Sequence, residues 1–230
     1  MPVTVGDDIK LYFGPHTLAP GLDNLEQVIV DFIDGAEKRL EIAVQELESR
    51  AIAEAILRAE IERKVQVYLV LEADYLAGKQ RPRTVAEAFE SKGAQEENRL
   101  LAAAALRATC WVRTDFNPKI FHQKFIIRDR EAVLTGSTNF TPTGVGSSPR
   151  GGNLNQVLTV NSRELARIYF REFREIKQGR FGRHSVDGTV EPHPEEVTID
   201  GVTFKVCFAP DHNPEMEIMK WMMKARDRVD

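Results

Sequence analysis

The chain has 230 residues, of which 42% are hydrophobic and 29% are charged. Its 31 lysine and arginine residues stand against 35 aspartate and glutamate residues, which gives a formal net charge of −4. This balance argues against a protein coated in positive charge for non-specific DNA binding, but it leaves room for a local basic groove. The two cysteines are too few for a disulfide scaffold.

Strands and helices are expected to alternate from the N-terminus onward. Periodic apolar residues predict the segments strand 9–13, helix 23–38, strand 40–47, helix 49–63 and strand 65–71. A polar and then alanine-rich stretch, 75–107, is expected to hold a loop and a helix. The predicted elements beyond it are strands 109–114, 120–128, 132–135 and 156–160 and helix 164–176, with Ser162 as its N-cap. This order predicts an α/β domain with a largely buried sheet.

Basic residues gather on one side of the helix predicted over 164–176. Arg167, Arg171 and Arg174 are three or four residues apart and therefore share a face. Such a face is most often solvated, and contact with the phosphates of a nucleic acid or an anionic membrane is the alternative.

A short internal repeat organises the chain. IKLYFGP at 9–15 matches FKVCFAP at 204–210, and an amphipathic helix follows each copy. These helices close with AEKRLE at 36–41 and ARDRVD at 225–230. Since 177–201 is rich in glycine, proline and charge, we expect a domain over 1–178, a linker over 179–202 and the truncated opening strand and helix of a second domain over 203–230. The second helix should then expose its methionines, Met216, Met219, Met222 and Met223.

The stretch FHQKFIIRDREAVLTGSTNF, 121–140, concentrates side chains suited to phosphate chemistry. On a strand, His122 and Lys124 project from one face, while Gln123 and Phe125 point the other way. Ser137 and Asn139 share a face if extended geometry continues after the next strand. Gly136 would allow a close approach of the backbone to a ligand.

These residue types can bind and cleave a phosphodiester. Lys124 supplies a positive charge for the non-bridging oxygens, while Ser137 and Asn139 supply neutral donors. The imidazole of His122 can attack phosphorus or transfer a proton. No cluster of aspartate, glutamate and histidine with metal-ligand spacing accompanies this set, so we expect no metal site and no cofactor.

HQKFIIRDREAVLTGSTN follows the pattern H-x-K-x4-D-x6-G-S-x-N and so resembles the phospholipase D superfamily. The resemblance covers most of residues 9–176 and implies a mixed β-sheet with helices on both faces. It also implies two such motifs that meet at a pseudo-twofold interface, where one histidine forms a phosphohistidine and the other protonates the leaving group. His122 is then the nucleophile or its acid partner, and Lys124, Ser137 and Asn139 bind phosphate.

Two positions of the catalytic motif need separate comment. Asp129 belongs to the motif with His122 and Lys124, but it lies at a turn and an odd number of residues from His122. We therefore interpret it as a structural hydrogen-bonding residue. Members of the family often carry a glutamate before the last strand that orients the histidine. Asn155 takes that place here, without a charge.

The leading hypothesis is a metal-independent phosphodiesterase, with a second H-x-K-D domain in the same parent chain. Its substrate is a phospholipid head-group ester or a nucleic-acid backbone. A second hypothesis is a homodimeric nuclease in which each chain supplies one His122. A third is a phosphate-binding module without catalysis, in which Asn155 marks a decayed site.

The N-terminus lacks the basic and apolar regions of a signal peptide. No stretch approaches the roughly 18 apolar residues that a spanning helix needs. We therefore expect a soluble, cytoplasmic protein. Peripheral association with a membrane is compatible with this expectation.

Overall fold

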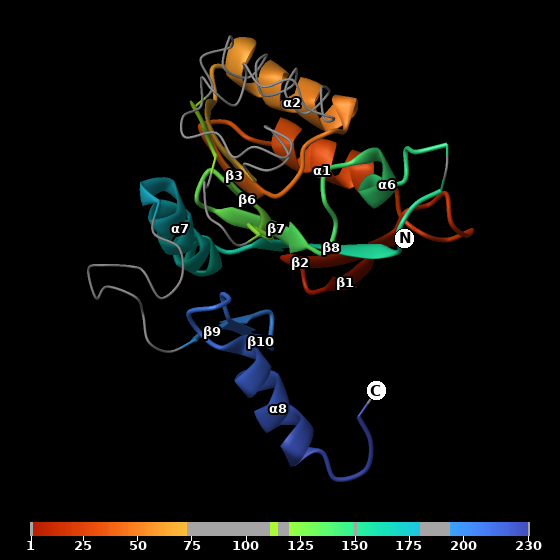
Figure 1. Cartoon of the computed structure of the whole chain (residues 1–230), viewed down its shortest axis with the longest axis vertical. Helices are drawn as coiled ribbons and strands as arrows, with labels where there is room; N and C mark the ends of the chain where they lie inside the picture. Colours follow the sequence, from red (N-terminus) through yellow and green to blue (C-terminus); the bar gives the residue numbers. More distant parts are fainter. Residues whose placement is uncertain (1, 73–110, 115–119, 150, 180–193, 230) are drawn as a thin grey trace.

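The computed structural model describes residues 2–72, 111–114, 120–149, 151–179 and 194–229 (Figure 1). The helix and loop expected over 75–107 lie outside these ranges.

A mixed β-sheet forms the centre of the molecule. Within the described ranges it has eight strands in the order β1-β2-β8-β7-β6-β3-β4-β5. Only the β3–β4 and β4–β5 pairs are parallel. The strands are β1 (Val3–Val5), β2 (Ile9–Gly14), β3 (Arg39–Val44), β4 (Gln66–Leu71), β5 (Trp111–Thr114), β6 (Lys124–Arg128), β7 (Ala132–Gly136) and β8 (Asn155–Asn161).

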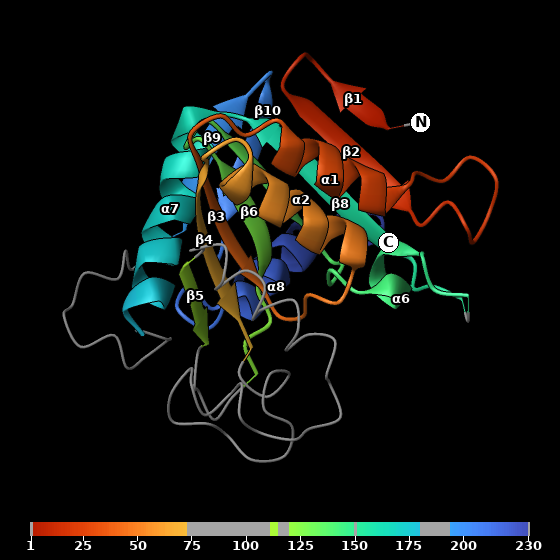
Figure 2. The same ribbon diagram turned by 90° about the horizontal axis from the view of Figure 1, so that it is seen from above.

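Helices cover both faces of this sheet, as the sequence predicts (Figures 1 and 2). The helices α1 (Leu25–Asp34) and α2 (Arg50–Ile61) lie on one face, and α7 (Arg163–Gln178) lies on the other. Ser162 accepts a hydrogen bond from the Leu165 N–H and caps α7, which confirms the prediction. A short helix, α6 (Pro142–Val145), follows the motif segment.

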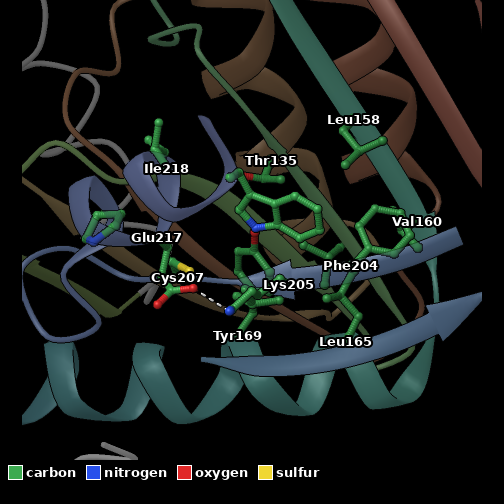
Figure 3. Close-up of a pocket in the computed structure, with 14 residues that line it drawn as sticks. Thr135, Leu158, Val160, Leu165, Tyr169, Phe204, Lys205, Cys207, Glu217 and Ile218 are labelled. Carbon is green, nitrogen blue, oxygen red and sulfur yellow. Dashed lines mark hydrogen bonds and ion pairs between the residues drawn. The ribbon is translucent and has the colours of Figure 1, made fainter. Parts of the chain in front are cut away.

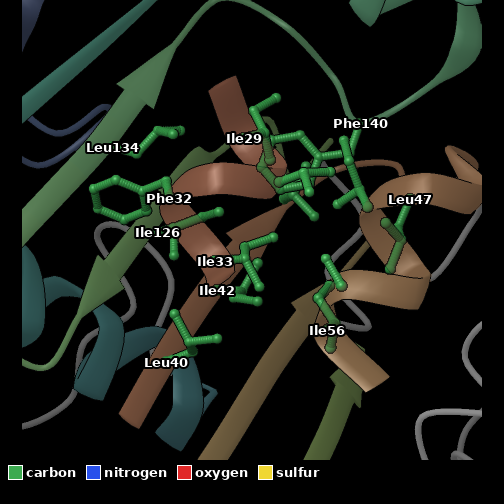
Figure 4. Packing of buried hydrophobic residues seen from close by; sticks show 14 of the residues in the cluster. Ile29, Phe32, Ile33, Leu40, Ile42, Leu47, Ile56, Ile126, Leu134 and Phe140 are labelled. Carbon is green, nitrogen blue, oxygen red and sulfur yellow. The ribbon is translucent and has the colours of Figure 1, made fainter. Parts of the chain in front are cut away.

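Alternation along the strands divides the core into two clusters. Ile126 of β6 joins the cluster beneath α1 and α2, with Ile29, Phe32 and Ile42 (Figure 4). Its neighbour Phe125 points to the other face. There the ring of Phe125 meets the rings of Tyr169 and Phe173 of α7 edge-on, with centroids 5.2 and 6.4 Å away.

Several boundaries differ from the sequence prediction. Strand β6 begins at Lys124, four residues later than expected, so His122 precedes the strand. Helix α1 is shorter than 23–38 because Asn24 caps its N-terminus and Gly35 ends it. The sequence analysis did not predict β1, whose three residues are exposed, or α6, which has four residues.

The C-terminal part forms a hairpin and a helix. The antiparallel strands β9 (Glu195–Ile199) and β10 (Val202–Val206) precede α8 (Pro214–Lys224). Strand β9 lies inside 179–202, so 195–199 form a strand within the stretch expected to be a linker. The physical reason is that Val197 and Ile199 of β9 bury their side chains against the sheet.

Two arginines of the basic face on α7 hold this hairpin. Arg167 and Arg171 both pair with Glu195 of β9, the first at 3.6 Å. These two side chains therefore do not belong to a free basic surface. The hairpin and α8 also enclose a pocket of about 390 Å³ against β7, β8 and α7 (Figure 3). Its walls include Leu158, Tyr169 and Trp221.

The exposed fractions of Met216, Met219, Met222 and Met223 are 45%, 52%, 51% and 83%, which confirms that the methionines of α8 are uncovered. None of the helices in the described ranges combines the length and the apolar character required to cross a bilayer.

Candidate active site

The ends of several strands bring the predicted site residues to one edge of the sheet. Lys124 begins β6 and pairs with Val44, the last residue of β3. Gly136 ends β7, and Asn155 begins β8 opposite Gly14 at the end of β2. Because β6 and β8 both run antiparallel to β7, the start of β6, the end of β7 and the start of β8 meet at this edge.

His122 and Lys124 lie together at this edge. The Lys124 ammonium donates hydrogen bonds to the His122 backbone oxygen at 3.1 Å and to Gln45 Oε1 at 3.2 Å. Lys124 is buried, whereas His122 is exposed. Partial burial and then the Lys124 charge lower the pKa of His122, which favours a neutral imidazole. Burial lowers the pKa of Lys124 to about 8, against the opposing charge of Glu46.

Asn139 joins this group through Gln45. Its Nδ2 donates to Gln45 Oε1 at 3.3 Å, so Gln45 accepts from two of the three predicted phosphate ligands, Lys124 and Asn139. Asn139 Oδ1 is buried and has no hydrogen-bond partner among the described residues. The geometry therefore gathers an imidazole, an ammonium and a carboxamide.

Ser137 and Asn155 form a second group at the same edge. Ser137 Oγ donates to Asn155 Oδ1 at 2.8 Å and accepts from the Gln156 N–H at 3.1 Å. Asn155 Nδ2 donates to the backbone oxygens of Gly144 and Asn153. None of these bonds reaches His122, so the described contacts do not show the expected orientation of the histidine by Asn155. Ser137 and Asn139 also form hydrogen bonds with different partners. The extended geometry that would place them on one face does not continue, because β7 ends at Gly136.

Gly136 has a different neighbour from the one predicted. A Cβ atom on this residue would lie 2.2 Å from the backbone oxygen of Gln156 in β8. The close approach that this glycine permits is thus between two strands, and we correct the expectation that it serves a ligand.

Asp129 lies beyond the other end of β6, roughly 16 Å along the chain from Lys124 at 3.3 Å per residue. Its carboxylate accepts hydrogen bonds from the backbone N–H groups of Glu37, Lys38 and Arg39 at 2.9, 2.7 and 2.8 Å. Its φ of 54° is in the left-handed region. These contacts agree with a structural role and separate Asp129 from the other catalytic-motif residues.

Two buried polar residues at the site were not predicted from the sequence. Gln45 follows β3 and is 2% exposed, and Glu72 follows β4 and is 1% exposed. The Glu72 carboxylate accepts a hydrogen bond from the Phe121 N–H, next to His122. The sequence signal for both is a polar residue directly after an apolar strand. Such a residue is expected to be buried and to have hydrogen-bond partners, because buried polar groups need them.

Three carboxylates elsewhere have ligand atoms close enough to hold a metal ion, within 4.8 Å of one another. Glu172 and Glu175 belong to α7, and Asp211 follows β10, so the cluster stands apart from the motif strands. Burial, followed by the charges of Asp211 and Glu175, raises the pKa of Glu172 to about 8.

Comparisons with known proteins place these observations in a family. The sequence model described as "Cardiolipin synthase, PLD-like domain" matches residues 29–177. No curated protein sequence matches the chain. Among solved structures, the phospholipase D family member Nuc from Salmonella typhimurium is similar, with a TM-score of 0.57 and 19% identity. That match covers 74% of this chain and 94% of Nuc.

Two further structures show the same fold. NucT from Helicobacter pylori has a TM-score of 0.51 and 14% identity, over 74% of this chain and 96% of NucT. The phosphatidylserine synthase from Haemophilus influenzae Rd KW20 has a TM-score of 0.50 and 16% identity, over 94% of this chain and 45% of the synthase. Because the matched family model spans well over half of the sequence, this chain belongs to the phospholipase D superfamily.

Proposed function

We propose that the chain is the catalytic part of a metal-independent phosphodiesterase that acts through a phosphohistidine intermediate. The observation that carries the proposal is the gathering of Lys124 and Asn139 beside His122 at one edge of the sheet. An ammonium and a carboxamide can bind the non-bridging oxygens of a phosphate while the imidazole faces phosphorus.

The proposed reaction has two steps. A neutral His122 imidazole attacks phosphorus with a ring-nitrogen lone pair, and the bond from phosphorus to the leaving oxygen breaks. A second, protonated imidazole gives its proton to that oxygen. Water then attacks the phosphohistidine and transfers a proton to the second imidazole, which restores both groups. The lowered pKa of His122 supports its role as the attacking base.

The second imidazole has to come from another motif, because the sequence contains one H-x-K only. We propose a second phospholipase D-like domain in the parent chain, and the internal repeat supports it. Each copy has a hairpin and then a helix: β1, β2 and α1 in the first, β9, β10 and α8 in the second.

The apolar pattern of the two helices supports the same proposal. Aligned through 36–41 and 225–230, the buried Ile29, Phe32 and Ile33 of α1 correspond to three apolar residues of α8. These are Ile218, Trp221 and Met222, which are 60%, 63% and 51% exposed. An apolar stripe of this kind on a helix normally packs against a sheet.

A homodimer that supplies one His122 from each chain is the alternative architecture. The substrate class stays open between a nucleic acid and a phospholipid, because the site binds the phosphodiester and not its substituents. The similarity to a phosphatidylserine synthase, at 16% identity, is one of fold and does not identify a substrate for this chain.

A phosphate-binding module without catalysis is the second candidate function. The bonds of Asn155 favour it, because they go to Ser137, Gly144 and Asn153 and leave His122 without a described orienting partner.

The test uses the full-length parent and the 230-residue chain, assayed on bis(p-nitrophenyl) phosphate with EDTA. We expect turnover by the parent, a phosphorylated histidine after acid-free quenching, and almost no turnover by the monomeric chain. General acid catalysis is typically worth roughly 10²–10⁴-fold, and one motif cannot supply it together with the nucleophile.

Each contrary result has a defined meaning. If EDTA stops turnover and added metal restores it, the histidine mechanism is wrong. If the chain is monomeric by light scattering and matches the parent, one motif suffices. If the parent binds phosphate without turnover, the protein is a binding module.

A further inference from the structure

Gln45 is a buried amide that contacts the side chains of Lys124 and Asn139. It is 2% exposed and directly follows β3. Its backbone N–H donates to the Gln123 oxygen at 3.1 Å, and its backbone oxygen accepts from the Glu72 N–H at 3.2 Å. These two bonds tie Gln45 to the segment before β6 and to the end of β4. The origin of its side chain is therefore fixed by the sheet.

The loop that carries Asn139 is held against the same segment. The Phe140 N–H donates to the Glu46 oxygen at 3.1 Å, and the N–H groups of Glu48 and Ser49 donate to the Phe140 oxygen at 2.8 and 2.7 Å. Backbone bonds thus bring Asn139 beside Gln45 from a position 94 residues away. The side-chain contact between them rests on a rigid frame.

The charge of Gln45 matters as much as its position. Lys124 is 8% exposed, and its two described hydrogen-bond acceptors, Gln45 Oε1 and the His122 oxygen, are both neutral. Neutral acceptors hold the ammonium in place and leave its charge available to an incoming anion. A carboxylate at position 45 would form an ion pair with Lys124 and offset that charge.

We propose that Gln45 is a positioning residue that holds Lys124 and Asn139 in the geometry that binds a phosphate, and that its neutral amide puts no negative charge in contact with the Lys124 ammonium. The inference rests on the proposed function, since it assigns phosphate binding to these two side chains. Gln45 itself does not contact the reacting atoms.

Three variants test the inference in the form of the protein that is active. Gln45→Met keeps the length of the side chain and removes the acceptor, whereas Gln45→Glu keeps an acceptor and adds a charge. Gln178→Met is the matched control, because Gln178 is exposed at the end of α7. The first measurement is the affinity for inorganic phosphate by calorimetry, with melting temperatures to show that each variant folds.

We expect Gln45→Glu to weaken phosphate binding at least tenfold and Gln45→Met to weaken it about fivefold. Gln178→Met should bind like the wild type. Where turnover is measurable, KM should rise more than kcat falls. The alkaline limb of the pH–rate profile should move up in Gln45→Glu, because a new carboxylate favours protonated Lys124 beside His122 and Glu46. A residue that only fills space would leave that limb unchanged.

Two folded Gln45 variants with phosphate affinity within twofold of wild type and an unmoved alkaline limb would overturn the inference. If Gln45→Glu fails to fold, the phosphate affinity of Gln45→Met decides by the same criterion. Wild-type protein that binds phosphate but never turns over a diester ends the proposed catalysis, and the affinities still decide the role of Gln45. Wild-type protein that binds no phosphate overturns this inference as well.

Discussion

The two ends of β6 carry residues of one sequence motif in different physical surroundings. At the Lys124 end, Lys124 and Asn139 share the side-chain acceptor Gln45 Oε1, Asn139 Oδ1 lacks a described partner, and His122 is exposed. At the Asp129 end, a carboxylate is occupied by three backbone N–H groups of the segment before β3. At the first end a buried side-chain oxygen is left without a described partner, whereas at the second end the carboxylate is fully engaged by the backbone. The first end therefore suits the binding of a ligand, and the second suits stabilisation of the fold.

The largest expected effect separates activity from stability at the Lys124 end. His122→Ala should lower turnover of the active form about 10³-fold or more, because it removes the proposed nucleophile. Its melting temperature should stay close to wild type, since the side chain is exposed. Turnover and thermal unfolding measured on one preparation check this. Retained activity would contradict the assignment of His122 as the nucleophile.

Asp129→Asn should show the reverse pattern. Asparagine tolerates the left-handed backbone at φ 54°, so the substitution tests the charge and one acceptor oxygen. We expect a loss of about 2 kcal/mol in the free energy of unfolding, since hydrogen bonds to charged groups are the stronger ones. Chemical denaturation measures it, with turnover per folded molecule unchanged. A variant as stable as wild type but inactive would assign Asp129 to catalysis.

Gly136→Ala tests a residue that lies at the Lys124 end of the sheet but contributes to strand packing. Its Cβ would press on the backbone oxygen of Gln156, and overpacking typically costs 1–3 kcal/mol. We expect about 2 kcal/mol or less by chemical denaturation. Gly151→Ala is a control for backbone strain without a steric contact, since a Cβ there meets nothing within 4 Å but the φ of 99° disfavours an L side chain. No loss at Gly136 would contradict the strand contact.

The last effect concerns pH and a buried carboxylate of β3. Burial raises the pKa of Glu41 from 4.5 to about 7, although Arg39 and Arg130 lower it. Its stabilising contribution is therefore complete below about pH 4.5 and is lost as the pH rises through 7. Glu41→Gln should flatten the loss of stability between pH 5 and 8, by roughly 2–3 kcal/mol. Denaturation at several pH values checks this, with exposed Glu62→Gln as control. An unchanged slope would show that Glu41 titrates normally.

Much of the fold follows from local patterns. The strand and helix order of the described residues between 9 and 178, the cap at Ser162 and the exposed methionines of α8 were all predictable, because the spacing of apolar residues and helix capping depend on near neighbours. The start of β6 and strand β9 were not. Strand β6 begins opposite the last residue of its antiparallel partner β3, and β9 is buried with residues such as Ile9 that are distant in sequence.

For the site, the sequence by itself determined which residues belong to the motif and that Lys124 and His122 lie together. The tertiary structure decided which partners those side chains have. Gln45 reaches Lys124 across 79 residues and Asn139 across 94, and Asn155 bonds Ser137 in place of His122. No local pattern contains such contacts, because strand order and register bring distant segments to one edge, and only there does the burial of a polar group select its partners.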